Sequence, residues 1–297
     1  MSAPDGALTT PVPTIERALE RAISEIALPD HLRAAVSYSL LGGGKRLRPL
    51  LAWWAAVAVG APGEASLPGG VAVELVHAFS LVHDDLPAMD NDDLRRGKPT
   101  LHKHAGEAMA ILAGDAMLNL AYQHLAMRAP SGLVGALARE LSLGTTGMIA
   151  GQVFDTLGGL PAGAEGVRAL ETIHLNKTGA LIIAACRMGG ILGLSARGLS
   201  EGGPSLNALS AYARDIGLMF QIVDDLIDVE QPAEHTGKRT RKDSDAGKLT
   251  YPGVLGIDSS RREVERLLAS SRAALAPLGE AARPLAELAS ALAIRTR

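Results

Sequence analysis

Apolar side chains recur along this chain with the three-to-four-residue spacing of amphipathic helices. Bounded by proline, glycine and capping residues, this spacing predicts helices over 14–28, 30–41, 49–59, 67–85, 107–127, 133–150, 167–192, 207–228, 260–276 and 280–294. No stretch alternates apolar and polar residues between hairpin turns, so the pattern predicts no sheet. We therefore predict an all-α protein.

Two of the predicted helices, around 70–85 and 210–228, are apolar on nearly every side. Helices of this kind belong inside a bundle. Glycine and proline concentrate in loops at 42–48, 87–104, 157–166 and 229–250, and none of these loops resembles an interdomain linker. We expect a flexible segment over 1–13, followed by a single-domain bundle of about ten or more helices over 14–297.

Composition narrows the class of protein further. Hydrophobic residues make up 47% of the chain and aromatic residues only 3%, and a core rich in Ala and Leu favours close helix packing. The formal net charge of −3 gives no basic field for nucleic acid. Cys186, the one cysteine, excludes an intramolecular disulfide.

Targeting signals are weak in this sequence. The first thirteen residues lack a basic start followed by an apolar stretch, so they do not resemble a signal peptide. The apolar stretch 181–194 is short for a membrane span and is interrupted by glycines. We expect a cytoplasmic protein without stable membrane insertion.

Both apolar core helices end in a cluster of aspartates. The members are Asp84, Asp85 and Asp90 in the first cluster and Asp224, Asp225 and Asp228 in the second. Asp224 and Asp228 are four residues apart and share a helix face, while Pro87 breaks the first helix so that Asp90 can turn back toward Asp84. Carboxylates this close repel each other unless cations lie between them, and Mg²⁺ prefers carboxylate and phosphate oxygens.

Each cluster alone is also compatible with acidic residues at a solvated helix end. Two clusters, each after an apolar helix, favour a metal site. An EF-hand is excluded because its spacing and central glycine are lacking.

Basic residues accompany both clusters. Three glycines precede Lys45 and Arg48, so the backbone there can approach a phosphate, although a solvated basic turn is the better explanation of this segment taken alone. Arg95 and Arg96 follow Asp90 within one loop, which is harder to explain as a solvated turn. Three further lysines, Lys238, Lys242 and Lys248, lie in the loop after the second cluster.

Four polar residues lie within or beside the apolar helices. Lys177 and Thr178 interrupt one such helix, where an unpaired lysine would be costly. His77 and Gln221 share helix faces with the aspartates that follow them, although His77 could equally be a satisfied core histidine. Acidic clusters, nearby cations and apolar helix walls together suit diphosphates that carry a hydrocarbon tail, and metal-assisted departure of diphosphate from an allylic carbon.

These residues resemble the trans-isoprenyl diphosphate synthases, the farnesyl and geranylgeranyl diphosphate synthase family. The matching segments are 43–49, 83–97, 151–152, 177–178, 220–228 and 247–252, in family order. The resemblance implies an all-α bundle around a deep central cavity, usually a homodimer. It also implies head-to-tail condensation of isopentenyl diphosphate with dimethylallyl or geranyl diphosphate.

The resemblance also implies a role for each site residue. Asp84, Asp90 and Asp224 would ligate Mg²⁺, three ions in all, with Asp85 and Asp228 supporting. The allylic diphosphate would be held by Arg95, Lys177 and Lys238, and isopentenyl diphosphate by Lys45, Arg48, His77 and Arg96. Lys248 would also bind substrate, and Thr178 and Gln221 would stabilise the carbocation. Arg241 stands where the family commonly has glycine, which puts the lysine assignments of that loop in doubt.

Product length depends on the floor of the pocket. Phe79 and Ser80 precede Asp84 by five and four residues, about 7.5 Å and 6 Å along a helix axis. In the family an aromatic residue at position 79 is typical of farnesyl synthases, so we predict (2E,6E)-farnesyl diphosphate, with geranylgeranyl diphosphate as the alternative. Two other hypotheses are a terpene cyclase, which the few aromatic residues disfavour, and a non-catalytic regulatory subunit of a heteromeric synthase.

Overall fold

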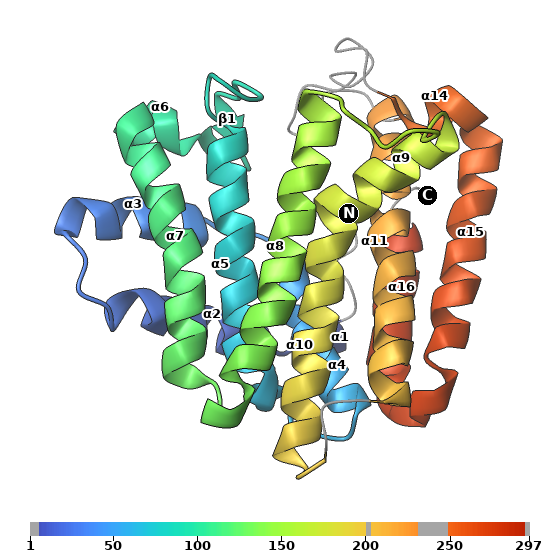
Figure 1. The fold of residues 1–297 in the computed structure, drawn as a ribbon, viewed down its shortest axis with the longest axis horizontal. Helices are drawn as coiled ribbons and strands as arrows, with labels where there is room; N and C mark the ends of the chain where they lie inside the picture. Colours follow the sequence, from blue (N-terminus) through green and yellow to red (C-terminus); the bar gives the residue numbers. More distant parts are fainter. Residues whose placement is uncertain (1–5, 200–202, 231–248, 295–297) are drawn as a thin grey trace.

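The computed structural model describes residues 6–199, 203–230 and 249–294. The described residues are predominantly helical, which confirms the all-α prediction (Figure 1). The α-helices are α1 Gly6–Thr9, α2 Val12–Ser24, α3 Asp30–Leu40, α4 Leu47–Ala58, α5 Leu67–Asp84, α6 Leu101–Ala105, α7 Glu107–Arg128, α8 Val134–Thr156, α9 Val167–His174, α10 Ala180–Ala196, α11 Pro204–Glu230, α14 Tyr251–Leu255, α15 Ile257–Ala274 and α16 Arg283–Ala293.

Short elements connect these helices. Three are 3₁₀ turns, η1 Gly63–Ser66, η2 Ser131–Leu133 and η4 Ala276–Ala282. A fourth, η3 Leu175–Gly179, is a π-helical turn between α9 and α10. Two strands, β1 Leu94–Arg95 and β2 Lys98–Pro99, pair antiparallel in a hairpin.

The long helices α5, α7, α8, α10, α11 and α15 run roughly parallel or antiparallel to one another (Figure 1). Helices α5 and α11 both end near the top of the view, α5 beside the β1–β2 hairpin and α11 on the side of α14 (Figure 1). The two aspartate clusters therefore lie at the same end of the bundle. This arrangement follows from the parallel direction of the two core helices.

One apolar core runs through the bundle, with buried residues from α2 through α16. Small residues allow its helices to approach closely. A Cβ atom added to Gly189 of α10 would lie 2.1 Å from the carbonyl oxygen of Ala52 in α4. The Ala- and Gly-rich composition therefore supports helix contacts that larger side chains would prevent.

Three sequence expectations need correction. The flexible segment over 1–13 is wrong for residues 6–13, because α1 and the start of α2 are helical and Leu8 is buried. The carbonyl oxygen of Leu8 accepts a hydrogen bond from Trp54 Nε1 at 3.2 Å, a contact that local periodicity does not reveal. The expectation of no sheet is wrong at the hairpin, whose strands have only two residues each.

The single helix expected over 167–192 is divided by η3 into α9 and α10.

Two described helical segments, Gly63–Asp84 and Val167–Ala196, are long and apolar enough to cross a membrane. The most apolar 18-residue stretch of the first segment is 67% buried inside the molecule, and that of the second is 72% buried. Burial of this extent is typical of the core helices of globular proteins.

Candidate functional site

The first aspartate cluster forms a turn at the end of α5. The backbone N–H of Asp90 donates to the carbonyl oxygen of Asp84 at 2.9 Å, so the chain turns back after Pro87 as predicted. The pKa of Asp84 is raised to about 6, chiefly by burial and also by the carboxylates of Asp90 and Asp85, while Lys177 and Arg95 oppose the shift. The structure therefore places two predicted carboxylates and two predicted cations around Asp84.

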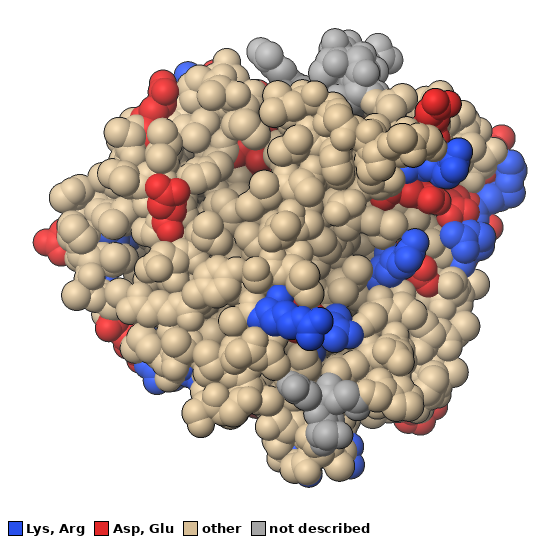
Figure 2. Space-filling model, viewed as in Figure 1, with Lys and Arg blue, Asp and Glu red and all other residues tan. Residues whose placement is uncertain are grey.

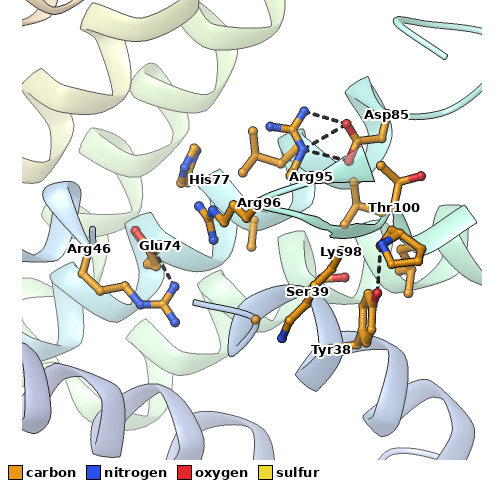
Figure 3. A pocket seen from close by; sticks show the side chains of 16 residues that line it. Tyr38, Ser39, Arg46, Glu74, His77, Asp85, Arg95, Arg96, Lys98 and Thr100 are labelled. Carbon is orange, nitrogen blue, oxygen red and sulfur yellow. Dashed lines mark hydrogen bonds and ion pairs between the residues drawn. The ribbon is translucent and has the colours of Figure 1, made fainter. Parts of the chain in front are cut away.

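Asp85 has a different environment from Asp84. It is 3% exposed and accepts hydrogen bonds from Arg95, with Nη2–Oδ1 at 2.6 Å and Nε–Oδ2 at 2.8 Å (Figure 3). A bidentate pair of this kind compensates a buried carboxylate and fixes the guanidinium. Asp85 thus holds Arg95 in place, and its predicted role as a supporting metal ligand stays a prediction.

The second cluster also divides into two kinds of aspartate. Asp225 is buried, accepts a hydrogen bond from the backbone N–H of Tyr251 at 2.9 Å, and lies 3.7 Å from Nε2 of His174. It therefore fastens α14 to α11, which explains why it points away from its neighbours. Asp224 and Asp228 are half-buried on α11, about one helical turn apart on the same face of the helix.

These carboxylates have the oxygen ligands that a divalent cation such as Mg²⁺ prefers. Within residues 6–199, 203–230 and 249–294, no group of three or more acidic, histidine or cysteine side chains could by itself hold a metal ion. The raised pKa of Asp84 reflects burial and crowding of negative charge, both of which a cation would relieve. Asp84 and Asp90 could supply carboxylate oxygens, while the oxygens of a bound diphosphate would complete the coordination.

The π-helical turn η3 carries Lys177 and Thr178. The hydroxyl of Thr178 donates to Oε1 of Gln221 on α11, so the two residues predicted to stabilise a cation are in contact. Lys177 Nζ donates to Oδ2 of Asp155 on α8 at 2.7 Å. The widened turn thus directs a lysine and a threonine out of an otherwise apolar helix, as expected for a π-bulge at a functional site.

Sequence reasoning missed Asp155. The available signal was an acidic residue one helical turn after Gly151 and Gln152, which belong to the motif already singled out. Gly151 allows α8 to lie against η3, because a Cβ atom there would lie 2.0 Å from the backbone nitrogen of Lys177. Both polar atoms of the Gln152 carboxamide are buried, without a hydrogen-bond partner among the described residues.

A second group of cations lies beside α5 and the β1–β2 hairpin. Arg46 is buried and bonds Glu16 at 2.6 Å and Glu74 at 3.0 Å, so it is a structural cation. Arg96 donates to the carbonyl oxygen of Gly43. Lys45 is exposed in the turn before α4.

His77 and Arg48 belong to this second group as well. Burial holds the pKa of His77 well below its usual value, and Arg48 and Arg96 lower it further, so its imidazole is neutral at pH 7. Burial also lowers the pKa of Arg48 to about 10, against the attraction of Glu74, and its Nε atom is buried without a partner among the described residues. This group therefore presents hydrogen-bond donors and positive charge that suit an anion.

A cavity of about 60 Å³ lies between α3, α5 and the hairpin (Figure 3). Its lining includes Ser39, His77, Arg96, Lys98 and Thr100. In Figure 3, Arg95 is turned toward Asp85 while Arg96 is turned to the opposite side. The two adjacent arginines of the hairpin are thus turned toward different neighbours, although both line the same cavity.

The residues predicted to control product length lie along α5 below Asp84. Phe79 is 7% exposed, and its ring contacts His83 edge-on with 5.6 Å between centroids. Ser80 Oγ donates to the carbonyl oxygen of His77 at 2.9 Å. Lys238, Arg241, Lys242 and Lys248 lie outside the described residues.

Comparison with known proteins places this geometry in a class. The family model described as Polyprenyl synthetase matches residues 29–281. The chain is 42% identical to an Arabidopsis thaliana heterodimeric geranylgeranyl pyrophosphate synthase large subunit 1, over 97% of this chain and 78% of that protein. It is 46% identical to geranylgeranyl pyrophosphate synthase 9 of the same plant, over 90% of this chain and 75% of that protein.

Solved structures agree on the fold. A farnesyl/geranylfarnesyl (FPP/GFPP) synthase from Zymomonas mobilis superimposes with a TM-score of 0.81 at 34% identity, covering 97% of this chain and 99% of that one. A geranyltransferase from Legionella pneumophila gives 0.82 at 34% identity, covering 98% and 96%. Fold and site therefore define an all-α prenyltransferase. The chain belongs to the polyprenyl synthetase family, which confirms the resemblance found in the sequence.

Proposed function

We propose that this protein condenses isopentenyl diphosphate head-to-tail with allylic diphosphates, and that the main product is geranylgeranyl diphosphate. The observation that carries the proposal is that the two adjacent arginines of the hairpin are turned to different sides, Arg95 toward Asp85 and Arg96 toward His77 (Figure 3). Two diphosphates must lie side by side for such a condensation, and each needs its own cations.

The allylic diphosphate binds on the side of the aspartates. Asp84, Asp90, Asp224 and Asp228 would hold Mg²⁺, which would supply positive charge to the diphosphate leaving group. Lys177 and Arg95 each bond one carboxylate, yet lysine has three donors and arginine five, so both can also bind phosphate oxygens. Lys238 and Lys248 are proposed to contribute from their loop.

Isopentenyl diphosphate binds on the side of His77. Arg48 and Arg96 supply charge, Lys45 adds an exposed ammonium group, and the neutral imidazole of His77 donates a hydrogen bond. A neutral donor is suitable here because a further positive charge would be destabilised by the neighbouring guanidinium groups.

The carbocation forms between these two groups. The hydroxyl of Thr178 and the carboxamide of Gln221 present oxygen dipoles that stabilise it without acting as nucleophiles in a dry site. The double bond of isopentenyl diphosphate attacks the allylic carbon, and a proton then leaves the adduct for the departing diphosphate. The apolar walls of α5 and α10 exclude water that would quench the cation.

Two observations point to different product lengths. The names of the Arabidopsis relatives support the C20 product over the C15 product predicted from Phe79. The bulky ring of Phe79, one helical turn or so below Asp84, supports farnesyl diphosphate as the second candidate. The name of the Zymomonas enzyme includes a farnesyl product, which keeps this candidate open.

One assay tests the proposal. Purified protein is incubated with Mg²⁺, isopentenyl diphosphate and dimethylallyl diphosphate, and the products are dephosphorylated and separated by chromatography. We expect C20 alcohol as the main product, and loss of product in excess chelator and in Asp84→Asn. Asp115→Asn, on the exposed face of α7, is the matched control and retains activity. Failure of the purified chain to form any prenyl alcohol would favour the regulatory-subunit hypothesis.

The role of Phe79 has a test of its own. Phe79→Met replaces a rigid ring by a flexible side chain of similar volume, so the growing tail can extend further down α5. We expect the main product to lengthen by at least one five-carbon unit. Ser80→Ala, one residue further along, is the companion variant because the Ser80 hydroxyl donates to the carbonyl oxygen of His77 in its own helix. An unchanged product distribution in Phe79→Met would contradict the assignment.

We also propose that the protein is a homodimer through α7 and α8. Large apolar side chains are exposed on these helices, including Leu112 at 56%, Leu143 at 59% and Ile149 at 49%. Few charged side chains interrupt this face in Figure 2. An apolar surface of this kind is typical of a subunit interface.

A further inference from the structure

The β1–β2 hairpin is too short to hold its own shape. Each strand has two residues, and the connection passes through Arg96 and Gly97, both with positive φ, at 54° and 75°. Isolated two-stranded hairpins are marginally stable even when they are longer. The hairpin therefore needs anchors on the helices around it.

The two adjacent arginines have different anchors. Arg95 is fixed by the bidentate pair with Asp85 at the end of α5. Arg96 lies on the other side, where it contacts the carbonyl oxygen of Gly43 and lies electrostatically close to His77 and Glu74 (Figure 3). The orientation of Arg96 depends on the turn and on the outgoing strand β2.

Tyr38 of α3 anchors that outgoing strand. Its hydroxyl donates to the carbonyl oxygen of Pro99 at 2.8 Å, across 61 positions of the chain (Figure 3). Its ring stacks on His104 of α6, with 4.1 Å between centroids and 5° between planes. One side chain thus joins α3, the end of β2 and the last turn of α6.

We propose that Tyr38, which lines the same cavity as Arg96, is a positioning residue that fixes Arg96 for the homoallylic diphosphate through its hydrogen bond to Pro99. This inference rests on the proposed function, in which Arg96 binds isopentenyl diphosphate and Arg95 faces the allylic diphosphate. Arg95 is held by a bidentate pair with the buried Asp85, whereas Arg96 has one hydrogen bond to a backbone carbonyl oxygen, so loss of the Tyr38 contact displaces Arg96 more than Arg95. The effect on the two substrates is therefore unequal.

The unequal effect is the measurable signature. Tyr38→Phe keeps the stacked ring and removes the hydrogen bond, which should raise KM for isopentenyl diphosphate about threefold to tenfold. KM for the allylic substrate and kcat stay within twofold of the wild type. Tyr38→Ala removes the stacking as well and raises KM for isopentenyl diphosphate further. Tyr122→Phe on α7 is the matched control, since its hydroxyl has no hydrogen-bond partner in the described part of the chain.

Calorimetric titration of each protein with isopentenyl diphosphate gives the same comparison without turnover. Weaker binding by Tyr38→Phe, at an unchanged thermal midpoint, supports the proposal. Equal KM and equal affinity in wild type and Tyr38→Phe would overturn it, and so would a parallel rise in KM for both substrates. A wild-type protein that neither binds isopentenyl diphosphate nor forms product would instead overturn the proposed function.

Discussion

At the level of single residues, this site is built from charges that already have protein partners. Lys177 bonds Asp155 and Arg95 bonds Asp85, at 2.7 Å and 2.6 Å. A buried charge without a partner would cost several kcal/mol, so these pairs hold each cation in position before any diphosphate arrives. Asp85 and Asp225 each bond a neighbouring protein group, and the predicted role of Asp85 as a supporting metal ligand stays a prediction.

Gln152 offers a prediction at this scale. Both polar atoms of its buried carboxamide lack partners among the described residues, so Gln152→Met should raise the free energy of unfolding by about 1–3 kcal/mol. Urea unfolding of the substrate-free protein measures this gain. Gln123→Met, on the partly exposed side of α7, should stay within about 0.5 kcal/mol of the wild type. A destabilised Gln152→Met would show that the carboxamide has an ordered partner.

At the level of elements, the contact between α8 and η3 positions Lys177. Periodicity predicted one helix over 167–192, and the position of Lys177 and Thr178 inside it was the only hint of irregularity. In the structure, the polar residues Lys177 and Thr178 lie in a π-helical turn, and this turn packs against Gly151 of α8. Helix patterns show no such turn because its extra residue leaves the apolar spacing on both sides intact.

Gly151→Ala should therefore disturb both stability and the Lys177–Asp155 pair. The new Cβ atom would meet backbone 2.0 Å away, which cannot be relieved by a side-chain rotation, so we expect a loss of about 1–3 kcal/mol. Thermal or urea unfolding measures the loss. The control on the same helix is Gly135→Ala, whose Cβ meets nothing within 4 Å and which should stabilise the helix by about 0.5–1 kcal/mol. Equal stability of the two variants would exclude tight packing at Gly151.

At the level of the whole molecule, the parallel helices α5 and α11 place both aspartate clusters at one end (Figure 1). The apolar face on α7 and α8 lies along the length of the bundle. Assembly through that face would leave the site end accessible to substrates. The proposed self-association and the proposed catalysis would thus use different parts of the molecule.

The double variant Leu143→Glu, Ile149→Glu tests this interface. Both side chains are largely exposed, so the subunit should fold normally, while two buried charges per partner should reduce dimer affinity by at least about a hundredfold. Light scattering after size-exclusion chromatography measures the change in mass. The matched control is Leu199→Glu, exposed at 48% beyond the end of α10. A wild-type protein that elutes as a monomer at micromolar concentration would contradict the proposed homodimer.

The sequence by itself determined the fold class, most helices and the two aspartate clusters, because apolar spacing and helical register are local properties. It also indicated the cations at Lys45, Arg48, Arg95, Arg96 and Lys177. Only the tertiary structure decided which charges pair, since Asp155 meets Lys177 and Tyr38 meets Pro99 through contacts between segments far apart in the chain. Pairing depends on how the helices pack, and packing is set by small residues such as Gly151 whose partners no local pattern identifies.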